Sequence, residues 1–282
     1  MSEWTGAGRL RGKIAVVTGA SRGCGRGVAR ALGQAGVTVY VTGRSTREGV
    51  GTQERMETIE ETAEMVTALG GVGIAVRVDH TVDSEVDAFF ARVLSEQGRL
   101  DLLVGNAWGG YEKMDEFSGA FWEMPIENWD RMFRAGLRSH LVSARYAAPL
   151  MAAQKHGLIV LTTTGLREKY QGNLFYDVCK SAINRMAYGM SHDLRPDRVA
   201  VIALAPGWMR TERMEGLTED ELAKTESPEY TGRAIVALAT DPSVLEKSGK
   251  LLDTADLARE YGFTDVDGRQ VPPFREIFPG VL

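Results

Sequence analysis

Short apolar runs recur along this chain at helix-sized intervals, and each has the length of a β-strand. Most of them are almost continuously apolar, which is typical of parallel strands covered on both faces. The segments 53–69 and 83–97 instead repeat their apolar residues at steps of three and four, which predicts amphipathic helices. We expect strands at 13–18, 37–42, 72–78, 101–105, 157–163, 198–204 and 249–252.

The alternation of strands and helices predicts an α/β fold, a doubly wound parallel sheet (Rossmann fold) of about seven strands with helices on both faces. Ligands of such sheets bind at the carboxyl ends of the strands. No linker or change in composition divides the chain, so we expect residues 1–282 to form a single domain with a C-terminal extension at about 253–282. Within the extension, 265–269 predicts a turn. The loop 108–125, rich in glycine and aromatic residues, either borders the substrate or is a surface elaboration.

The composition changes this picture little. The chain has 282 residues, of which 44% are hydrophobic and 25% charged, as in ordinary soluble proteins. Its net charge of −5 gives no electrostatic case for nucleic acid or an anionic membrane, and no apolar run reaches the roughly 18–20 residues of a membrane span. The first six residues lack a signal-peptide pattern, and two cysteines make a disulfide framework implausible, so we expect a cytoplasmic protein. The four histidines lack metal-ligand spacing, and we predict no metal site.

The first strand runs directly into a glycine-spaced turn and then into an amphipathic helix. Glycine lets the backbone approach a pyrophosphate closely, and the free N–H groups at the start of the helix favour negative charge. We therefore expect a dinucleotide to bind at Gly19-Ala20-Ser21-Arg22-Gly23-Cys24-Gly25. Cys24 is either a small filler of this turn or a thiol whose alkylation blocks the cofactor.

The residues after the second and third strands indicate which dinucleotide binds. An acidic residue after the second strand would select NAD(H), but this chain has Gly43 followed by Arg44. Arg22 and Arg44 together favour the 2′-phosphate of NADP(H), unless either only caps a solvated edge. Asp79, with His80 beside it, is placed either to accept from the adenine amino group or to form a plain turn.

Tyr176 and Lys180 are four residues apart in a predicted helix and share one face of it. Lowering a phenol pKa from 10 to 7 takes about 4 kcal/mol. One ammonium about 4 Å away, at an effective dielectric of about 20, supplies roughly that much. Thr163, at the end of the fifth strand and 13 residues before the tyrosine, offers a hydroxyl to a substrate carbonyl. We expect these three residues to be catalytic.

Together these motifs resemble the short-chain dehydrogenase/reductase family over essentially the whole chain. The glycine turn is similar to the cofactor motif of the family, and Tyr176 to Lys180 to its catalytic pair. Gly105-Asn106-Ala107-Trp108 is similar to its Asn-Asn-Ala-Gly segment, and Pro206-Gly207-Trp208-Met209-Arg210-Thr211 to its nicotinamide loop. Residues 120–123, 236–242, 256–259 and 265–269 are similar to one branch of the family, which implies NADPH-linked reduction of steroids or other bulky lipophilic carbonyls.

The resemblance implies a role for each residue. Tyr176 would be the general acid in reduction, and Lys180 would also hold the nicotinamide ribose. Both would contact the cofactor, as would Asn106, Ala107, Pro206, Gly207 and Thr211. The resemblance also implies a small carbonyl or alcohol substrate and a homodimer or homotetramer formed through 126–154 and 175–194.

Three residues depart from the family pattern. Thr163 stands where serine is usual, with Thr164 as the alternate bearer of its role. Gly136 replaces the helix asparagine that relays protons through water to the lysine, so a relay would use backbone, water or another residue. Trp108 replaces a small glycine, either as a wall of the substrate pocket or as simple packing.

Two other functions compete with a carbonyl reductase or alcohol dehydrogenase. A protein that binds NADP(H) as a sensor without turnover would explain Gly136, although it would not need the intact Tyr176 and Lys180 pair. An epimerase or dehydratase that holds and recycles its cofactor is the third possibility.

Overall fold

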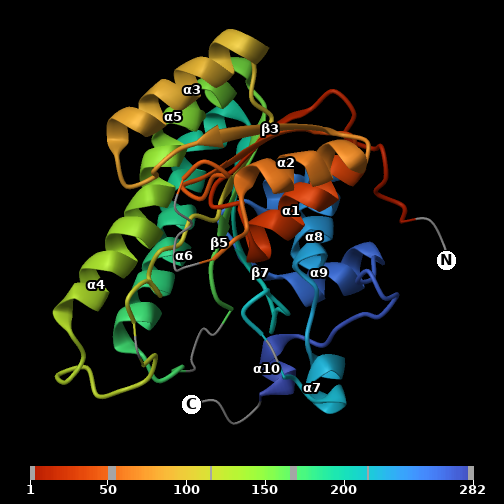
Figure 1. The fold of residues 1–282 in the computed structure, drawn as a ribbon. Coiled ribbons are helices and arrows are strands. Elements are labelled where there is room, and N and C mark those ends of the chain that lie inside the picture. The colour runs from red at the N-terminus through yellow and green to blue at the C-terminus, as the bar shows by residue number, and fades with distance from the viewer. Residues whose placement is uncertain (1–3, 50–54, 115, 166–169, 215, 279–282) are drawn as a thin grey trace.

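A parallel sheet of seven strands forms the centre of the molecule (Figure 1). The computed structural model describes residues 4–49, 55–114, 116–165, 170–214 and 216–278. The strand order is β3-β2-β1-β4-β5-β6-β7, which confirms the predicted fold class. The strands are β1 (Ile14–Val17), β2 (Thr38–Gly43), β3 (Val72–Arg77), β4 (Leu102–Gly105), β5 (Gly157–Thr162), β6 (Val199–Ala205) and β7 (Leu251–Asp253).

Helices cover both faces of the sheet because successive side chains of each strand point to opposite faces. In β1, Ala15 and Val17 join one core cluster, whereas Ile14 and Val16 join the other. The first cluster lies under α1 (Gly23–Gln34), α2 (Ile59–Ala68), α8 (Pro228–Thr240) and α9 (Thr254–Tyr261). The second lies under α3 (Asp83–Gln97), α5 (Ser139–Gln154) and α6 (Leu174–Leu194).

The remaining helical segments are short. A π-helical segment, η2 (Phe133–Arg138), joins α4 (Ile126–Met132) to α5. The 3-10 turns η3 (Arg195–Asp197) and η4 (Val244–Lys247) precede β6 and β7, and α7 (Glu219–Lys224) precedes α8. None of the helices in the described ranges is both long enough and apolar enough to cross a membrane.

The predicted elements agree with the structure except at some boundaries. The helix expected at 53–69 begins at Ile59, because Thr58 caps it and exchanges hydrogen bonds with Glu61; its expected first two residues lie outside the described residues. The last strand is found two residues later than expected, at Leu251–Asp253. β3 is an edge strand whose Val72 is 53% exposed, so it is not covered as completely as its apolar sequence suggests.

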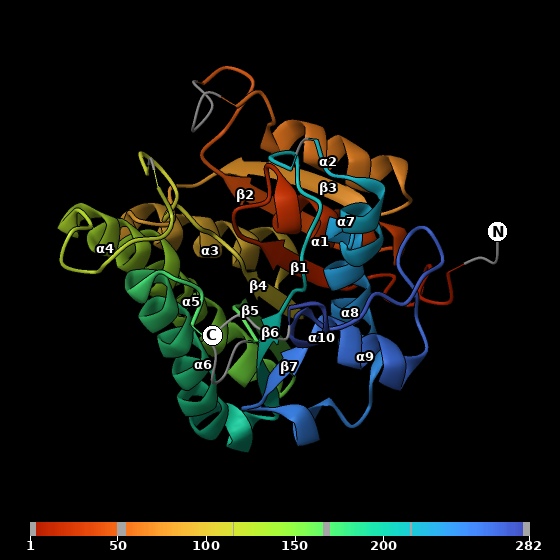
Figure 2. The same ribbon diagram turned by 90° about the horizontal axis from the view of Figure 1, so that it is seen from below.

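The chain after β7 folds back along the sheet and ends its described part in α10 (Phe274–Ile277), near β7 and α9 (Figure 2). Arg275 of α10 forms ion pairs with Asp253, at 3.3 Å, and with Asp256, at 2.7 Å. The predicted turn at 265–269 is present, since the N–H of Asp265 donates to the carbonyl of Arg269 at 2.7 Å.

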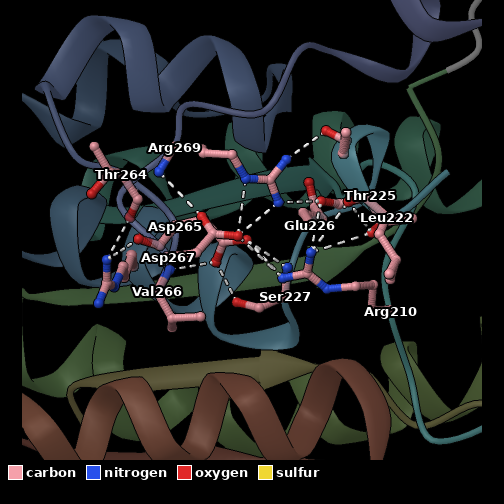
Figure 3. Close-up of polar contacts among 12 residues, drawn as sticks. Arg210, Leu222, Thr225, Glu226, Ser227, Thr264, Asp265, Val266, Asp267 and Arg269 are labelled. Atoms are coloured by element: carbon pink, nitrogen blue, oxygen red, sulfur yellow. Dashed lines mark hydrogen bonds and ion pairs between the residues drawn. The ribbon is translucent and has the colours of Figure 1, made fainter. Parts of the chain in front are cut away.

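Asp265 fixes this turn to the segment that precedes α8 (Figure 3). Its carboxylate is buried and accepts from the N–H of Ser227 at 2.8 Å and from the hydroxyl of Ser227. The guanidinium of Arg210 lies 3.6 Å from both Asp265 and Asp267. The extension is thereby tied to residues that follow Pro206.

Candidate active site

Two adjoining cavities lie at the carboxyl ends of the strands. The glycine cavity, of about 290 Å³, is bounded by the glycine turn, and the tyrosine cavity, of about 240 Å³, by Tyr176 and Lys180. Both are lined by Cys24, Asn106, Trp108 and Tyr111, so they form two parts of one binding region. Residues at the carboxyl ends of β1, β4, β5 and β6 line this region, as expected for the ligand site of a doubly wound sheet.

The glycine turn requires glycine at positions 19 and 25, for different reasons. Gly19 has a positive φ of 64°, and a Cβ built on it would lie 2.7 Å from the Cα of Ala107. A Cβ on Gly25 would lie 2.3 Å from the carbonyl oxygen of Gly19. Gly25 therefore lies behind the turn and lets α1 pack closely, whereas Gly19, Ser21, Arg22, Gly23 and Cys24 line the glycine cavity.

The start of α1 presents an anion site. The N–H of Gly23 donates to the carboxylate of Glu212 at 2.8 Å. This carboxylate lies where the helix dipole and the free N–H groups favour a negative charge. Thr211, expected to contact the cofactor, lines the glycine cavity beside Glu212.

Asn106 and Ala107 brace the turn from β4. The Asn106 amide donates to the carbonyls of Thr18, at 3.1 Å, and Gly19, at 3.0 Å. The N–H groups of Asn106 and Ala107 both donate to the Thr18 hydroxyl, at 2.8 and 2.9 Å. The sequence motif begins at Thr18, but its role in bracing the turn was not predicted, although its place directly after β1 is a signal for it.

Arginine side chains gather at the far end of the glycine cavity. Arg22 and Arg44 line it, as does Arg213, which was not predicted. Burial lowers the pKa of Arg22, and the nearby cations Arg55 and Arg213 add to this lowering. Arg44 forms an ion pair with Glu112 of the long loop.

Asp79 and His80 line the same cavity, but their side chains form hydrogen bonds with different parts of the protein. Asp79 accepts from the N–H of Thr81 at 2.9 Å and from its hydroxyl at 2.7 Å, which is a turn-forming arrangement. The ring nitrogens of His80 lie 2.7 Å from the Thr42 hydroxyl and 3.2 Å from the Ser143 hydroxyl. Burial lowers the pKa of His80 to about 4, so its neutral ring belongs to the protein interior.

The tyrosine cavity brings together Tyr176, Lys180, Thr163 and Thr164. Asn173 caps α6, since its side chain accepts from the N–H of Tyr176 at 2.9 Å. The Lys180 ammonium lies 5.6 Å from the centre of the Tyr176 ring. The Thr163 hydroxyl donates to the Lys180 carbonyl at 3.0 Å, which ties the end of β5 to α6.

The electrostatics of Tyr176 differ from the expectation. Its pKa was expected to be lowered by Lys180; the structure instead raises it well above the usual value through burial and contact with Tyr111. Three aromatic rings surround it: Tyr111 stacks at 6.2 Å between ring centres, and Trp108 and Phe117 meet it edge to face. Burial also lowers the pKa of Lys180, to about 8. Loss of hydration is the largest cause of both shifts.

The far wall of the tyrosine cavity comes from the Pro-Gly loop and the C-terminal extension. Pro206, Gly207 and Met209 line it, and so do Phe274 and Arg275 of α10. Nothing in the sequence of the extension marked Phe274 and Arg275 as site residues, because only the fold carries α10 to this edge. A Cβ built on Gly207 would lie 2.6 Å from a carboxylate oxygen of the buried Glu226.

Both cysteines are free thiols in the structure. Burial raises the pKa of Cys24 to about 12, so this thiol stays protonated at neutral pH, as expected of a filler. Among the described residues, no group of three or more His, Cys, Asp or Glu side chains is arranged to hold a metal ion.

Comparisons with known proteins find similar sequences and similar folds. The family model described as short chain dehydrogenase matches residues 13–222. The chain is 40% identical to mouse dehydrogenase/reductase SDR family member 1, covering 94% of this chain and 87% of the relative, and 39% identical to the human protein of that name, covering 95% and 88%. A solved 7α-hydroxysteroid dehydrogenase, in complex with NADH and 7-oxo glycochenodeoxycholic acid, superposes with a TM-score of 0.72 at 24% identity, covering 94% of this chain and 98% of that one.

Proposed function

This chain belongs to the short-chain dehydrogenase/reductase family, and from that premise we propose that it interconverts a carbonyl and a secondary alcohol with NADP(H). Membership makes it an oxidoreductase of a family that acts on CH–OH groups with a nicotinamide cofactor. One observation carries the finer proposal. A cavity with an anion site and an arginine cluster opens directly into a cavity with a tyrosine, a lysine and two threonines.

The residues present fit a dinucleotide. The close approach of Gly19 to Ala107 leaves no room for a side chain at the turn, and the Glu212 carboxylate at the Gly23 N–H stands where a pyrophosphate would bind. Arg22 and Arg44 support the choice of NADP(H), because two guanidinium groups can pair with a 2′-phosphate. When bound, the cofactor would supply or accept the hydride.

The residues of the tyrosine cavity would manage the proton. Tyr176 would donate a proton to the carbonyl oxygen during reduction and accept it during oxidation. Lys180 would hold the nicotinamide ribose. Thr163 would orient the carbonyl, although its hydroxyl must then leave the Lys180 carbonyl; Thr164, in the same cavity, is the alternate.

The lining also supports a class of substrate. Trp108, Tyr111, Tyr176, Met209 and Phe274 contribute apolar and aromatic surface to a lining that also carries threonines, Lys180, Asp253 and Arg275. Such a surface favours a bulky lipophilic carbonyl, such as a steroid, over a small polar one.

The test is NADPH oxidation with a panel of ketones and aldehydes. We expect steady consumption with at least one bulky carbonyl, and its loss by at least about a hundredfold in Tyr176→Phe, because general acid catalysis contributes roughly that much. Tyr176→Phe should still bind NADPH. Binding without turnover of any carbonyl would instead support a sensor, and cofactor that copurifies without net oxidation would support an epimerase or dehydratase.

The assembly and compartment follow the same proposal. Leu141 on α5 and Val178 and Tyr188 on α6 are exposed apolar residues, which supports a homodimer or homotetramer formed through these helices. Two free thiols fit a reducing cytoplasm. Light scattering on the purified protein would give the number of copies, and a monomer would contradict the first part.

A further inference from the structure

The indole of Trp108 is held between two glycines. A Cβ built on Gly136 would lie 2.4 Å from Cζ3 of Trp108, and one built on Gly110 would lie 2.5 Å from Cζ2. Neither position could carry a side chain without displacing the ring. The two departures noted in the sequence, tryptophan at 108 and glycine at 136, therefore occupy one and the same space.

The face of this indole meets the ammonium of Lys180. The ammonium nitrogen lies 4.1 Å from the centre of the ring, which is within the range of a cation–π contact. The edge of the same indole contacts the Tyr176 ring, with 5.6 Å between ring centres. One side chain thus contacts both members of the Tyr176 and Lys180 pair.

Among the residues that the structure describes, no carboxylate forms an ion pair with this lysine, although Asp253 lines the same cavity. Cys179, on its own helix, and Cys24, on α1, would favour its charged form only as thiolates, and burial raises the pKa of both thiols. His140 on α5 lies close enough to interact with it, and burial lowers the pKa of that imidazole to about 3, so it is neutral. Lys180 is itself only 7% exposed. The ring face of Trp108 is therefore a principal source of attraction for a nearly buried cation.

We propose that Trp108 is a positioning residue that holds the Lys180 ammonium against its ring face, in place of the side chain that Gly136 lacks. This inference rests on the proposed function for its consequence in catalysis. Its physical content, the contact between ring and ammonium, can be tested without turnover.

The first test compares two variants of similar size at position 108. Trp108→Phe keeps an aromatic face, whereas Trp108→Leu removes it, and both leave a comparable space. The ionisation of Lys180 is followed by NMR in protein labelled with ¹³C-lysine, with Lys180→Arg to assign the signal. Burial already lowers the Lys180 pKa to about 8. We expect a further lowering in Trp108→Leu by about one pH unit, which is about a tenfold loss of proton affinity, and a value near that of the wild type in Trp108→Phe.

The second test combines Trp108→Gly with Gly136→Asn and compares the double variant with each single variant. Gly136→Asn alone should lower the melting temperature and reduce activity more than tenfold, because its Cβ would collide with the indole. Trp108→Gly alone should lose the ring contact. Combining Trp108→Gly with Gly136→Asn should recover both stability and activity relative to either single variant.

Each outcome decides the inference. Equal Lys180 pKa values in the Phe and Leu variants, or a double variant no better than Gly136→Asn alone, would overturn it. If the wild type reduces no carbonyl, the proposed function fails, while the NMR titration and the melting temperatures still decide whether Trp108 holds Lys180.

Discussion

Arg44 shows how a single residue can prepare a site for a charged ligand. Its guanidinium is paired with Glu112 and is partly exposed at the edge of the glycine cavity. Arg22 lies on the same lining, where burial lowers its pKa and Glu57 and Glu112 partly oppose that lowering. A 2′-phosphate in that place would compete with Glu112 for Arg44 and would offset the burial of Arg22.

Replacing Arg44 by alanine should therefore raise the KM for NADPH by one to two orders of magnitude and leave that for NADH nearly unchanged. The loss of one charged contact, worth about 1.5–3 kcal/mol, sets this magnitude. Glu112→Gln is the matched control and should lower the KM for NADPH, because it frees Arg44. Steady-state kinetics with both cofactors measures the effect. Equal changes for NADPH and NADH in Arg44→Ala would count against the 2′-phosphate.

The residues of the tyrosine cavity show what sequence can and cannot predict at this scale. The spacing of Tyr176 and Lys180 and the position of Thr163 after a strand were enough to predict that the three residues lie together, and all three line one cavity. The pKa of Tyr176 could not be predicted, because Tyr111 and Phe117 come from a loop far away in the sequence. Their burial of the phenol is a property of the folded chain.

At the scale of elements, the start of α1 and the segment after the Pro-Gly loop act on each other. Glu212 places a carboxylate on the N–H of Gly23, at the positive end of the helix dipole. A dinucleotide must displace this carboxylate before its own phosphates reach the same N–H. Glu212 is thus placed to compete with the cofactor phosphates.

Glu212→Gln should bind NADPH about two- to fivefold more tightly, since a charge at a helix N-terminus is worth about 0.3–1 kcal/mol. Isothermal titration calorimetry would measure this affinity. Glu219→Gln, at an exposed position on α7, removes the same charge without touching Gly23 and serves as the control. Unchanged or weaker binding in Glu212→Gln would show that the carboxylate does not compete.

The elements themselves were predictable where one force dominates. Almost continuously apolar runs marked the strands, which are buried along their length in β1, β4, β5 and β6, and the helix at 83–97 lies where its periodicity placed it. The start of α2 at Ile59 depended on the capping pair Thr58 and Glu61, which outweighed the apolar periodicity upstream. The π-helical segment η2 had no sequence signal other than Gly136, whose importance appears only with the indole beside it.

At the scale of the whole molecule, one buried acid links the stability of the fold to pH. Glu226 is fully buried beneath Gly207 and accepts a hydrogen bond from Thr231 at 3.2 Å. Burial, together with Asp265 and Asp253, raises its pKa to about 8. The native state therefore holds a proton on Glu226 that the unfolded state releases above its ordinary pKa of about 4.3.

The Glu226 contribution to stability should accordingly be lost as the pH rises from about 4.3 to about 8, with the full cost present above pH 8. Below about pH 6.5 the buried, neutral His80 and His140 act in the opposite direction, so the Glu226 effect is measured as a difference between variants. Glu226→Gln should remove this contribution and raise the free energy of unfolding at pH 8; each tenfold change in proton affinity corresponds to about 1.4 kcal/mol. Urea unfolding at several pH values measures both effects. Glu127→Gln, at an exposed position, should leave the slope unchanged. Parallel slopes in Glu226→Gln and the wild type would refute the prediction.

The Asp265 contacts have a consequence for anyone who recombines this protein with its relatives. Asp265 is buried against Ser227 and faces Arg210, so the C-terminal extension and the chain that follows Pro206 form one packed unit. A chimera that takes only one of these two segments from a relative would leave a buried carboxylate or a guanidinium without its partner. Both segments must therefore be exchanged together to transfer the pocket of the relative.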